Sequence, residues 1–569
     1  MVITSGELLL DLFEACGVEY VFCSPGTEWT PLWEGLLNRG GKINLKYINC
    51  RHEILAISAA QGYTEVTGRL PAVLLHSSVG PLMGAMAMRN ALSARAPMLI
   101  FSGETCEHCG DEEVKAQGWQ WLGLLSDIGG NSALVKDYVK WSSAVKTRDG
   151  LADAVLRGSQ IALSAPRGPV YISVPSELLL KSAATAKIQR PVPYIVALEP
   201  SESDLRKVSK QLINGKHPII IADHAGRNPE AAATLTRLAE MLSAPVFDTI
   251  LHFSSNISST HPLYQGQVTP EALKEADIVF VVAAAVPWYP PSAGPGDKAK
   301  IILLAEDTRH ERWPYWNYRV DIAINADIAG GLAALEKLVR AEKARQKTSA
   351  ALYRERLESW RQKHEEMATA MVKKALAVKA NKPIATRWLL HSAKGVFLDG
   401  AIILDETILH THILHQYLAE PGRYIKPAYG GLGVGLGAAL GVKLANPLRP
   451  VILLIGDGAF NYNPVLAGLG LGQEYNLPIL IIILNNGGYM AMKKGYRTLY
   501  PQGWAASHDN FIGVDIKPAP DYVKIAEAFG AFAEKLTEPE KIQSALKRGL
   551  KQIAGGRAAL LDVIVDKSL

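Results

Sequence analysis

An aspartate and a pair of asparagines follow two long apolar runs near the end of the 569-residue chain. Gly456-Asp457-Gly458 ends the run VILLIG, and Asn485-Asn486 ends the run ILIIIL. Such runs predict buried parallel strands, and ligands bind beyond the carboxyl ends of such strands. Carboxylate, amide and carbonyl oxygens suit Mg²⁺, and flanking glycines let the backbone approach a phosphate. Either motif alone is typical of a turn, but the two together predict a magnesium pyrophosphate site.

Continuous apolar runs, closed by small or polar residues and followed by helix-length stretches, recur along the chain. Runs of Val, Ile and Leu are typical of strands buried on both faces, and their alternation with helices indicates an α/β class. The runs are PAVLLHSS (71–78), PMLIFSGE (97–104), HPIIIAD (217–223), ADIVFVVAAA (276–285), KIILLAED (300–307), AIILDE (401–406), PVILLIGDG (450–458) and LPILIIILNN (477–486). We therefore predict doubly wound parallel sheets.

Two stretches interrupt this alternation. Residues 181–204 are rich in Pro, Ser and Ala without a clean period, which indicates a connector. Residues 340–380 are highly charged, with apolar residues at roughly helical intervals, which predicts a surface helix leading into the last domain. The length suggests three or four domains of about 150 residues each, and the two interruptions favour three. The predicted domains are residues 1–185, 190–340 and 370–569.

The composition excludes several classes of protein. Apolar residues make up 48% of the chain and charged residues 20%, as in ordinary globular proteins. The 60 Lys and Arg against 55 Asp and Glu form no basic run suited to nucleic acid, and no apolar run is long enough for a membrane span. The five cysteines crowd into the first fifth of the chain, which indicates no disulfide framework and fits a reducing, cytoplasmic setting. The N-terminal segment does not resemble a signal peptide.

The paired polar motifs resemble the signature of thiamine diphosphate-dependent enzymes, in which GDG is followed at a similar distance by NN. In that family the aspartate, the second asparagine and the carbonyl two residues later bind Mg²⁺. The resemblance therefore implies Asp457, Asn486 and Gly488 as metal ligands. It also implies that neighbouring residues contact the cofactor, namely Gly456, Gly458, Ala459 and Tyr489.

A glutamate segment near the N-terminus resembles the same family. YINCRHEILAISAAQGYTEVTGR places Glu53 after a short strand and at the head of a helix. In the family, the corresponding carboxylate trades a proton with the aminopyrimidine ring, which helps the exocyclic amine deprotonate the thiazolium carbon. A glutamate in the first turn of a helix is otherwise a favourable partner of the helix dipole. The distant GDG and NN motifs favour the catalytic interpretation of Glu53.

The glycine-rich segment KPAYGGLGVGLGAALGVKLANP (426–447) invites a dinucleotide-binding interpretation. Its glycines fit the dinucleotide fingerprint only in a relaxed form, and they precede a strand rather than follow one. Relative to the thiamine diphosphate family, Gly430 aligns with the backbone that receives the aminopyrimidine. Leu432 aligns with the bulky apolar residue that bends the cofactor, with simple core packing as its alternative role.

The resemblance covers essentially the whole chain and implies a pyrimidine-binding, a central and a pyrophosphate-binding domain, in that order. The branch of benzoylformate decarboxylase and acetohydroxyacid synthase matches best. SPGTE (24–28) resembles the first loop of benzoylformate decarboxylase, which implies Pro25 near the cofactor and Thr27 near the substrate carboxylate. LHSSVG (75–80) resembles its catalytic histidine loop and implies His76 as a proton relay, although a histidine at a strand end is otherwise often a core residue.

The chain departs from that branch at the second active-site histidine, where VPWYPPSAGPG (286–296) has Pro290. His410 and His412, in DETILHTHILHQ, are candidates to replace it near the substrate. His412 and His415 lie three residues apart on an expected helix, so packing or exposure is the alternative for them.

Cys106-Glu-His-Cys109 suggests a zinc or redox site, but it lacks the second pair of ligands that a structural zinc site requires. The segment lies where relatives place a substrate-pocket loop. The residues there that are candidates to contact substrate are Glu107, His108 and Gln117.

The resemblance implies a thiamine diphosphate- and Mg²⁺-dependent, non-oxidative decarboxylase of a 2-oxo acid, acting through ylide and enamine intermediates. Because the enamine is either protonated or added to a second carbonyl, a carboligase or carbon–carbon lyase, similar to acetolactate synthase or benzaldehyde lyase, is the alternative. A dinucleotide-dependent oxidoreductase using Gly431–Gly441 is a remote one. FAD is not expected, because IIIADHAGRNP (219–229) contains no convincing adenine-dinucleotide loop.

The expected partners are a small-molecule 2-oxo acid and, for the carboligase alternative, an aldehyde or ketone acceptor. Glu53 and Asp457 belong to different predicted domains, and relatives pair these domains across two chains. The active unit is therefore expected to be a homodimer or homotetramer, with no nucleic-acid or membrane partner.

Overall fold

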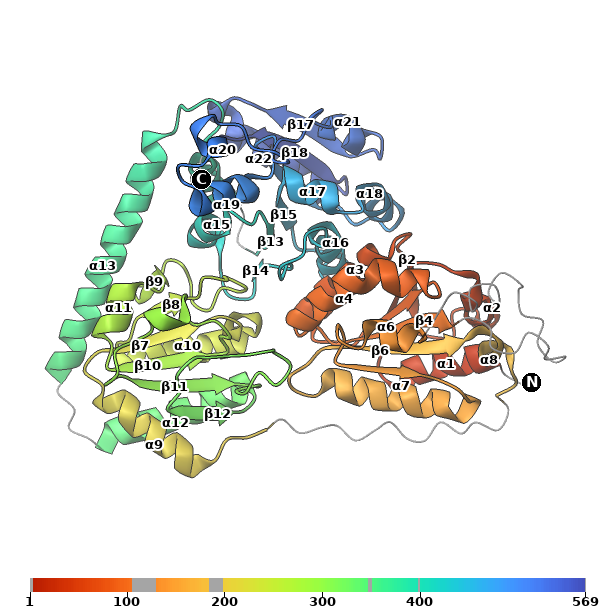
Figure 1. Ribbon diagram of the computed structural model, residues 1–569, viewed down its shortest axis with the longest axis horizontal. Coiled ribbons are helices and arrows are strands. Elements are labelled where there is room, and N and C mark those ends of the chain that lie inside the picture. The colour runs from red at the N-terminus through yellow and green to blue at the C-terminus, as the bar shows by residue number, and fades with distance from the viewer. Residues whose placement is uncertain (1–3, 105–128, 184–197, 346–349, 398–399, 568–569) are drawn as a thin grey trace.

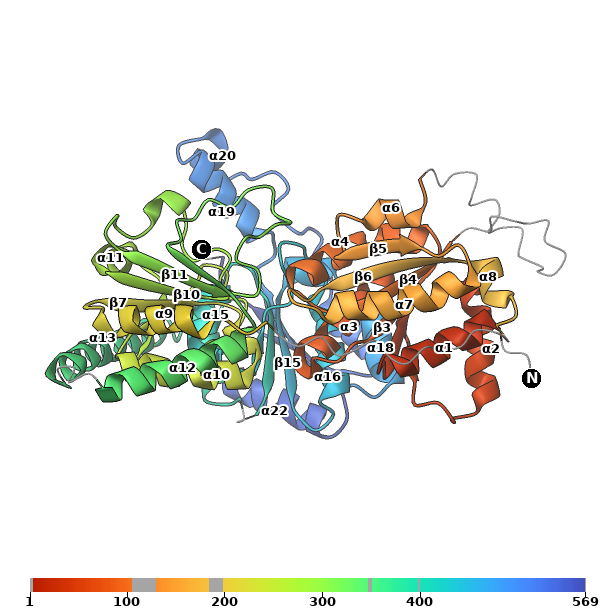
Figure 2. The ribbon, with the colours of Figure 1, turned by 90° about the horizontal axis from the view of Figure 1, so that it is seen from below.

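The structure is a computed structural model that describes residues 4–104, 129–183, 198–345, 350–397 and 400–567. Three six-stranded sheets are present, and their paired strands all run parallel. Helices flank each sheet, and the three α/β units meet at a common junction (Figure 1, Figure 2). The prediction of an α/β fold with three doubly wound parallel sheets is confirmed.

The N-terminal unit brings two loops with polar residues to one edge of its sheet. Its strands are β1 (Tyr20–Cys23), β2 (Lys46–Asn49), β3 (Ala72–Leu75), β4 (Met98–Glu104), β5 (Trp141–Ala144) and β6 (Pro169–Pro175), in the order β2-β1-β3-β4-β6-β5. Its helices are α1 (Ser5–Ala15), η1 (Thr27–Trp29), α2 (Thr30–Arg39), α3 (Glu53–Thr67), α4 (Val79–Ser93), α6 (Asn131–Val135), α7 (Arg148–Leu163) and α8 (Ser176–Leu180). Cys23 of β1 pairs with Leu74 of β3, so the loops that follow these strands leave the sheet side by side.

The central unit repeats the architecture without the glycine-rich segments. Its strands are β7 (Pro218–Ala222), β8 (Val246–Asp248), β9 (Tyr264–Gln267), β10 (Ile278–Val282), β11 (Lys300–Ala305) and β12 (Ile322–Asn325), in the order β12-β11-β10-β7-β8-β9. Its helices are α9 (Glu202–Asn214), η2 (Ala225–Arg227), α10 (Pro229–Leu242), α11 (Pro270–Glu275), η3 (Pro291–Ala293) and α12 (Ile328–Arg345). Strands β7, β10 and β11 are the predicted apolar runs, and their interior residues are buried on both faces.

The C-terminal unit contains the GDG and NN motifs at the ends of neighbouring strands. Its strands are β13 (Ile402–Glu406), β14 (Tyr424–Ile425), β15 (Val451–Gly456), β16 (Leu480–Asn485), β17 (Phe532–Leu536) and β18 (Ala559–Ile564), in the order β14-β13-β15-β16-β18-β17. Its helices are α14 (Thr386–Lys394), α15 (Thr411–Leu418), α16 (Gly435–Ala445), α17 (Asp457–Tyr462), α18 (Val465–Glu474), α19 (Met490–Leu499), α20 (Trp504–Ser507), α21 (Tyr522–Glu527), η4 (Pro539–Lys541) and α22 (Ile542–Ala554).

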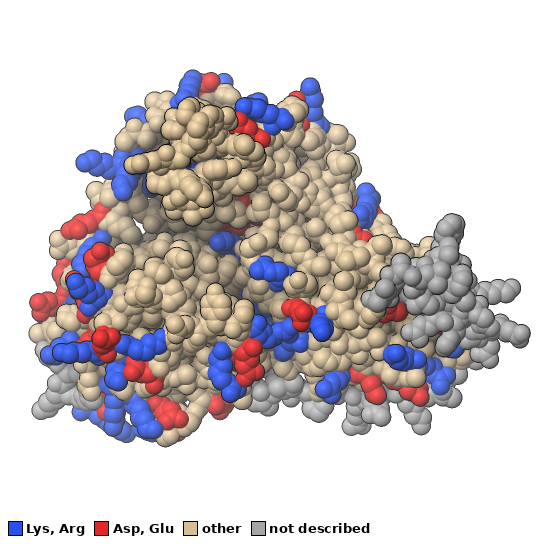
Figure 3. All heavy atoms as spheres, viewed as in Figure 1, with Lys and Arg blue, Asp and Glu red and all other residues tan. Residues whose placement is uncertain are grey.

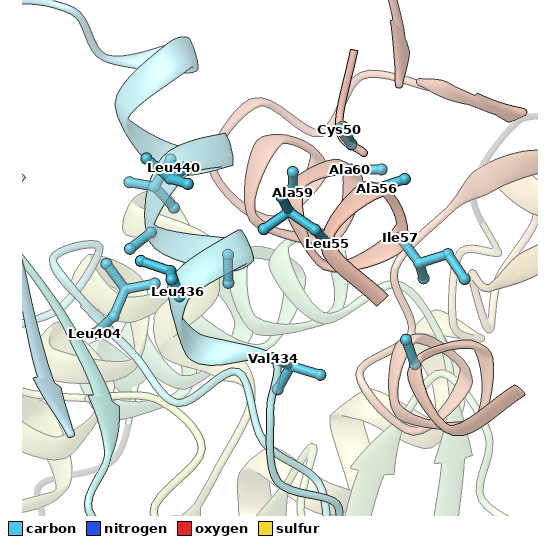
Figure 4. Close-up of a cluster of buried hydrophobic side chains, with 14 of the residues drawn as sticks. Cys50, Leu55, Ala56, Ile57, Ala59, Ala60, Leu404, Val434, Leu436 and Leu440 are labelled. Atoms are coloured by element: carbon cyan, nitrogen blue, oxygen red, sulfur yellow. The ribbon is translucent and has the colours of Figure 1, made fainter. Parts of the chain in front are cut away.

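Helix α3 of the N-terminal unit packs directly on α16 of the C-terminal unit (Figure 4). The glycines of both helices face the partner backbone, because a Cβ at Gly62 would overlap the carbonyl oxygen of Ala438, and one at Gly441 would overlap that of Ala59. Leu55 of α3 and Leu436 of α16 belong to one buried cluster. Close helix packing of this kind requires the small residues that the glycine-rich segment supplies.

The predicted surface helix is α13 (Ala350–Ala377), which runs along the outside of the molecule (Figure 1). Its inner face attaches to the central unit through both apolar and polar contacts, and Trp360 and Met367 pack against that unit's core. Tyr353 donates its hydroxyl to the carbonyl of Ile213, and Arg356 donates to the carbonyl of Gly215. The sequence therefore predicted the helix and the apolar residues along it, but not these polar contacts.

On the face of the molecule seen in Figure 3, Lys and Arg side chains are interspersed with Asp and Glu side chains. Among the helices of the described residues, none combines the length and apolar character needed to cross a bilayer.

Candidate cofactor site

The GDG and NN motifs meet because β15 and β16 are neighbours, with Gly456 paired to Leu484. Asp457 begins α17 and is only 2% exposed. Burial raises the pKa of its carboxyl group to about 6, although the backbone N–H groups of Gly458, Gly487 and Gly488 oppose that rise by hydrogen bonding. A buried carboxylate ringed by donors at a sheet edge is suited to a ligand that carries positive charge.

The two asparagines of the NN motif have different surroundings. Asn485 is buried, and its side chain donates to Asp562 at 2.9 Å and accepts from the N–H of Gly487 at 3.1 Å. Asn486 is half-buried, and among the described residues its side-chain oxygen accepts a hydrogen bond only from the N–H of Gly488, at 3.2 Å. The first asparagine thus shapes the loop, while the oxygen of the second retains acceptor capacity for a ligand.

The donor set fits a hard divalent cation. Asp457, Asn486 and the carbonyl of Gly488 are all oxygen donors on one loop system, which is the chemistry that Mg²⁺ selects. The glycines are needed there, because a Cβ at Gly458 would lie 2.7 Å from the ring of Tyr489 and one at Gly488 would lie 2.6 Å from the carbonyl oxygen of Val514. The residues present therefore fit a magnesium-bound pyrophosphate, and the cofactor contacts expected of Gly456, Ala459 and Tyr489 stay predictions.

The loop that holds Gly430 and Leu432 is fixed by a residue that the sequence did not single out. Glu406, at the end of β13, is fully buried and accepts the backbone N–H groups of residues 433, 434 and 435 at 2.7, 3.2 and 2.9 Å. Asn463 donates to the same carboxylate at 2.9 Å. The acidic end of the run AIILDE was the available signal for this role. Gly430 is exposed with a φ of +92°, and Leu432 is half-buried against the core.

Helix α4 of the N-terminal unit lies against this same loop. Asn90 donates to the carbonyl of Pro427 and accepts the N–H of Tyr429, both at 2.6 Å. A Cβ at Gly431 would approach the sulfur of Met86 to 2.6 Å. The loop with Gly430 and Leu432 is therefore clamped between the N-terminal and C-terminal units.

Glu53 is the first residue of α3, as predicted, and is half-buried beside α4, since a Cβ at Gly84 would lie 3.7 Å from its Cβ. His76 follows β3 and lies close enough for the Glu53 charge to help raise its pKa. The structure thus brings Glu53 and His76 together at one end of the N-terminal sheet.

Glu28 is a second functional candidate that the sequence analysis missed. Its side chain is fully buried, and both carboxylate oxygens lie 2.9 Å from Nδ1 of His76. The hydrogen bond to Glu28 is the main cause that raises the pKa of His76. Glycines at 26 and 103 make room for this carboxylate, because a Cβ on either would overlap it. Its place four residues after Ser24, in the loop at the end of β1, was the only sequence signal.

The remaining predicted site residues lie in three different parts of the structure. Pro25 and Thr27 are exposed in the loop after β1, and Pro290 is exposed in the central unit. His410 and His412 line a cavity of about 220 Å³ with Lys494 and Asp566, and the magnesium-site residues are not among its lining. The predicted substrate contacts of these two histidines remain a prediction.

Several predicted features lie outside the described residues. They are Cys106, Glu107, His108, Cys109 and Gln117.

The glycine-rich segment is accounted for without a dinucleotide. Gly435 packs on Glu406, Gly433 adopts a φ of +99° against the carbonyl of Tyr462, and Gly437 faces Ser58 of α3. Each glycine thus permits a close contact inside the protein.

Comparison with known proteins assigns all three units. The model of the N-terminal thiamine pyrophosphate (TPP) binding domain of thiamine pyrophosphate enzymes matches residues 3–116, that of their central domain matches residues 205–338, and that of their C-terminal TPP binding domain matches residues 409–563.

Relatives match over nearly the whole chain. Benzoylformate decarboxylase of Pseudomonas aeruginosa is 26% identical, covering 96% of this chain and 96% of the relative. The acetolactate synthase large subunit of Buchnera aphidicola is 24% identical, covering 100% of this chain and 95% of the relative. The crystal structure of benzoylformate decarboxylase from Polynucleobacter necessarius has the same fold, with a TM-score of 0.79 at 20% identity over 100% of this chain and 99% of that one. The chain belongs to the thiamine pyrophosphate enzyme family.

Proposed function

We propose that the chain is a thiamine diphosphate- and Mg²⁺-dependent, non-oxidative decarboxylase of a 2-oxo acid. The observation that carries the proposal is the convergence of Asp457 and Asn486 at neighbouring strand ends, in a chain whose N-terminal unit presents Glu53 beside His76. The predicted residues 1–185, 190–340 and 370–569 then serve as pyrimidine-binding, central and pyrophosphate-binding domains.

The chain's own residues have distinct roles in this reaction. Asp457, Asn486 and the Gly488 carbonyl hold Mg²⁺, and Leu432 shapes the cofactor from its half-buried position. Bound thiamine diphosphate supplies a cationic ring that accepts the electron pair left when the substrate carboxylate departs as CO₂. The Glu53 carboxylate holds and moves a proton at the cofactor, and His76 moves one at the substrate.

The assembly is proposed to be a homodimer or homotetramer. Apolar side chains of α4 are exposed, with Val79, Leu82 and Met83 at 58%, 57% and 54%, and so are Tyr462 and Leu466 of the C-terminal unit at 59% and 66%. A second copy of the chain that covers these surfaces removes their apolar area from water. Sedimentation of the purified protein measures this state, and a monomer with full activity contradicts it.

Glu28→Gln is expected to lower the pKa of His76, because a neutral amide of the same shape replaces the carboxylate that raises it. As a proton donor, His76 is active below its pKa, so the alkaline limb of the kcat/KM profile should move to lower pH. NMR titration of the ring and the pH profile measure the two effects. Glu34→Gln, at an exposed position of α2, is the matched control and should leave both unchanged. If the alkaline limb of the kcat/KM profile does not move in Glu28→Gln, His76 is not the proton donor.

A product screen tests the proposed function. Pyruvate, benzoylformate and branched 2-oxo acids are assayed with and without an aldehyde acceptor. Release of CO₂ that depends on both thiamine diphosphate and Mg²⁺ is the expected result. Equal activity without either one, together with no thermal stabilisation by the pair, overturns the proposal.

The second candidate function is carboligation, because acetolactate synthases are among the relatives. In the same screen, a hydroxyketone formed in preference to a free aldehyde identifies this outcome. FAD is not expected in either case, and the absorbance spectrum of the purified protein checks that expectation.

A further inference from the structure

A buried cluster of one aspartate and two histidines joins the central and C-terminal units. Asp248 ends β8 and His252 follows it in the next loop, while His415 lies on α15 of the C-terminal unit. All three side chains are almost wholly buried, and a ligand atom of each lies within 4.8 Å of the others. Nδ1 of His415 lies 3.1 Å from Oδ2 of Asp248, and Nδ1 of His252 lies 3.9 Å from the same oxygen.

The hydrogen bonds of His415 leave one ring nitrogen directed at the cluster. Nε2 of His415 lies 3.2 Å from the carbonyl oxygen of Ser254, so Nε2 carries a proton and donates it. Nδ1 then faces the carboxylate of Asp248, with the hydroxyl of Tyr264 at 3.4 Å. Histidines that bind metals usually donate their other ring N–H to a carbonyl in this way, which fixes the ring and leaves the first nitrogen for the ion.

His252 supplies a second and independent observation. It is 3% exposed, and neither of its ring nitrogens has a hydrogen-bond partner among the described residues. Burying an imidazole without a hydrogen-bond partner costs free energy. A hydrogen bond between His415 and Asp248 explains those two residues, but it leaves both ring nitrogens of His252 without a partner among the described residues. The backbone of His252 is left-handed, with a φ of +51°, a strained conformation that the surrounding fold must hold.

We propose that Asp248, His252 and His415 bind one divalent transition-metal ion of the zinc class. Two imidazoles and a carboxylate are known ligands of such ions. In a tetrahedral site with metal–ligand bonds of about 2.0 Å, the ligand atoms lie about 3.3 Å from one another. The separations of 3.1 and 3.9 Å at Asp248 approach that spacing. The hydroxyl of Tyr264 donates to Oδ2 of Asp248 at 2.9 Å and fixes the carboxylate from outside the ligand set.

The ion fastens two units of the fold, because its ligands come from both. The same boundary is bridged by an isolated antiparallel β-bridge between Ser254 and Ile425 and by Lys426, which donates to the carbonyl of Leu251 at 2.7 Å. The carboxylates of Asp223 and Asp405 act on Lys426 at this boundary. The three ligands are buried and none of them belongs to the proposed magnesium site, so the proposed ion has a structural role of its own.

The test uses the full-length protein, stripped with a chelator and then saturated with thiamine diphosphate and Mg²⁺ so that the Asp457 site is filled. Calorimetric titration with ZnCl₂ is expected to show one tight equivalent that raises Tm. CoCl₂ at the same site is expected to give the intense visible bands of four-coordinate cobalt. The proposal is overturned if the wild-type protein binds no equivalent of Zn²⁺ tightly, or if its cobalt complex lacks these bands. Neither result depends on a variant.

Variants locate the ion. His252→Asn is expected to weaken zinc binding at least ~100-fold, and a variant that keeps the tight equivalent overturns the assignment. His261→Asn is the matched control, because His261 lies in the same unit and pairs with Glu240 at the surface. The double variant Cys106→Ser, Cys109→Ser should also bind one equivalent of Zn²⁺ tightly. If it does not, the ion belongs to the cysteine segment and the proposal is wrong.

Discussion

Glu53→Gln is expected to lower kcat by about 10³-fold while thiamine diphosphate and Mg²⁺ still bind. The amide keeps the shape of the side chain at the start of α3 but can neither take up nor release the proton that the carboxylate is proposed to move. The loss should therefore fall on kcat rather than on cofactor affinity. Turnover is measured under cofactor saturation, and cofactor affinity is measured by calorimetry on the same preparation.

Glu65→Gln is the matched control for Glu53→Gln. Glu65 lies on the same helix and is buried, with Gln61 donating to it at 2.9 Å and Arg227 within 3.8 Å. A general disturbance of α3 would lower turnover in both variants, whereas a proton-transfer role lowers it about 10³-fold only at Glu53. Turnover of Glu53→Gln within tenfold of the wild type contradicts the catalytic assignment.

Inner strands such as β3, β10 and β15 were predictable because they are continuous apolar runs, whereas edge strands such as β5 (WSSA) are not. A run such as VILLIG has no polar face to expose, so it is stable only between two layers of helices, and β15 is buried along residues 451–455. The same logic placed Asp457 and Asn486 at one sheet edge, because both follow strands of a parallel sheet. The apolar runs did not specify the order of the strands. The GDG and NN motifs meet because β15 and β16 are neighbours in the sheet.

The missed residues share a physical cause. Glu28 meets His76 across 48 positions, and Glu406 meets Gly433 across 27, so neither pair leaves a local pattern. Both depend on loops that leave neighbouring strands, and such contacts follow from register rather than from residue spacing. A carboxylate at a strand end is the only local signal, and many solvent-exposed turns carry the same signal.

The glycine-rich segment shows how one pattern serves several constraints. A phosphate-binding fingerprint and a tightly packed helix both require glycine, and spacing alone separates them poorly. Here the partner of α16 is the backbone of α3, in a different unit of the chain. Helix α3, which begins with Glu53, is thus packed within one chain against α16, which follows the loop that presents Leu432.

Asp457→Asn is expected to abolish turnover by removing the charged magnesium ligand. An amide oxygen can still accept the backbone N–H groups around it, so the fold at the end of β15 should persist. Without the carboxylate, the affinity for thiamine diphosphate with Mg²⁺ should fall at least ~100-fold, because the remaining donors are neutral. The measurement is the rise in Tm on adding the pair, which should be present in the wild type and absent in the variant.

Asp405→Asn separates metal binding from the loss of any buried charge. Asp405 lies in the same sheet and is also fully buried, but its carboxylate serves Thr407 and Tyr424, at 2.7 and 2.8 Å. Asp405→Asn should unfold at lower temperature than the wild type, because it leaves buried donors with a weaker acceptor. Asp457→Asn should not, because burial raises the pKa of Asp457 to about 6, and its negative charge therefore destabilises the cofactor-free fold at neutral pH. Only Asp457→Asn should lose the additional rise in Tm on adding the cofactor and Mg²⁺, and an equal rise in both variants would remove Asp457 from the ligand set.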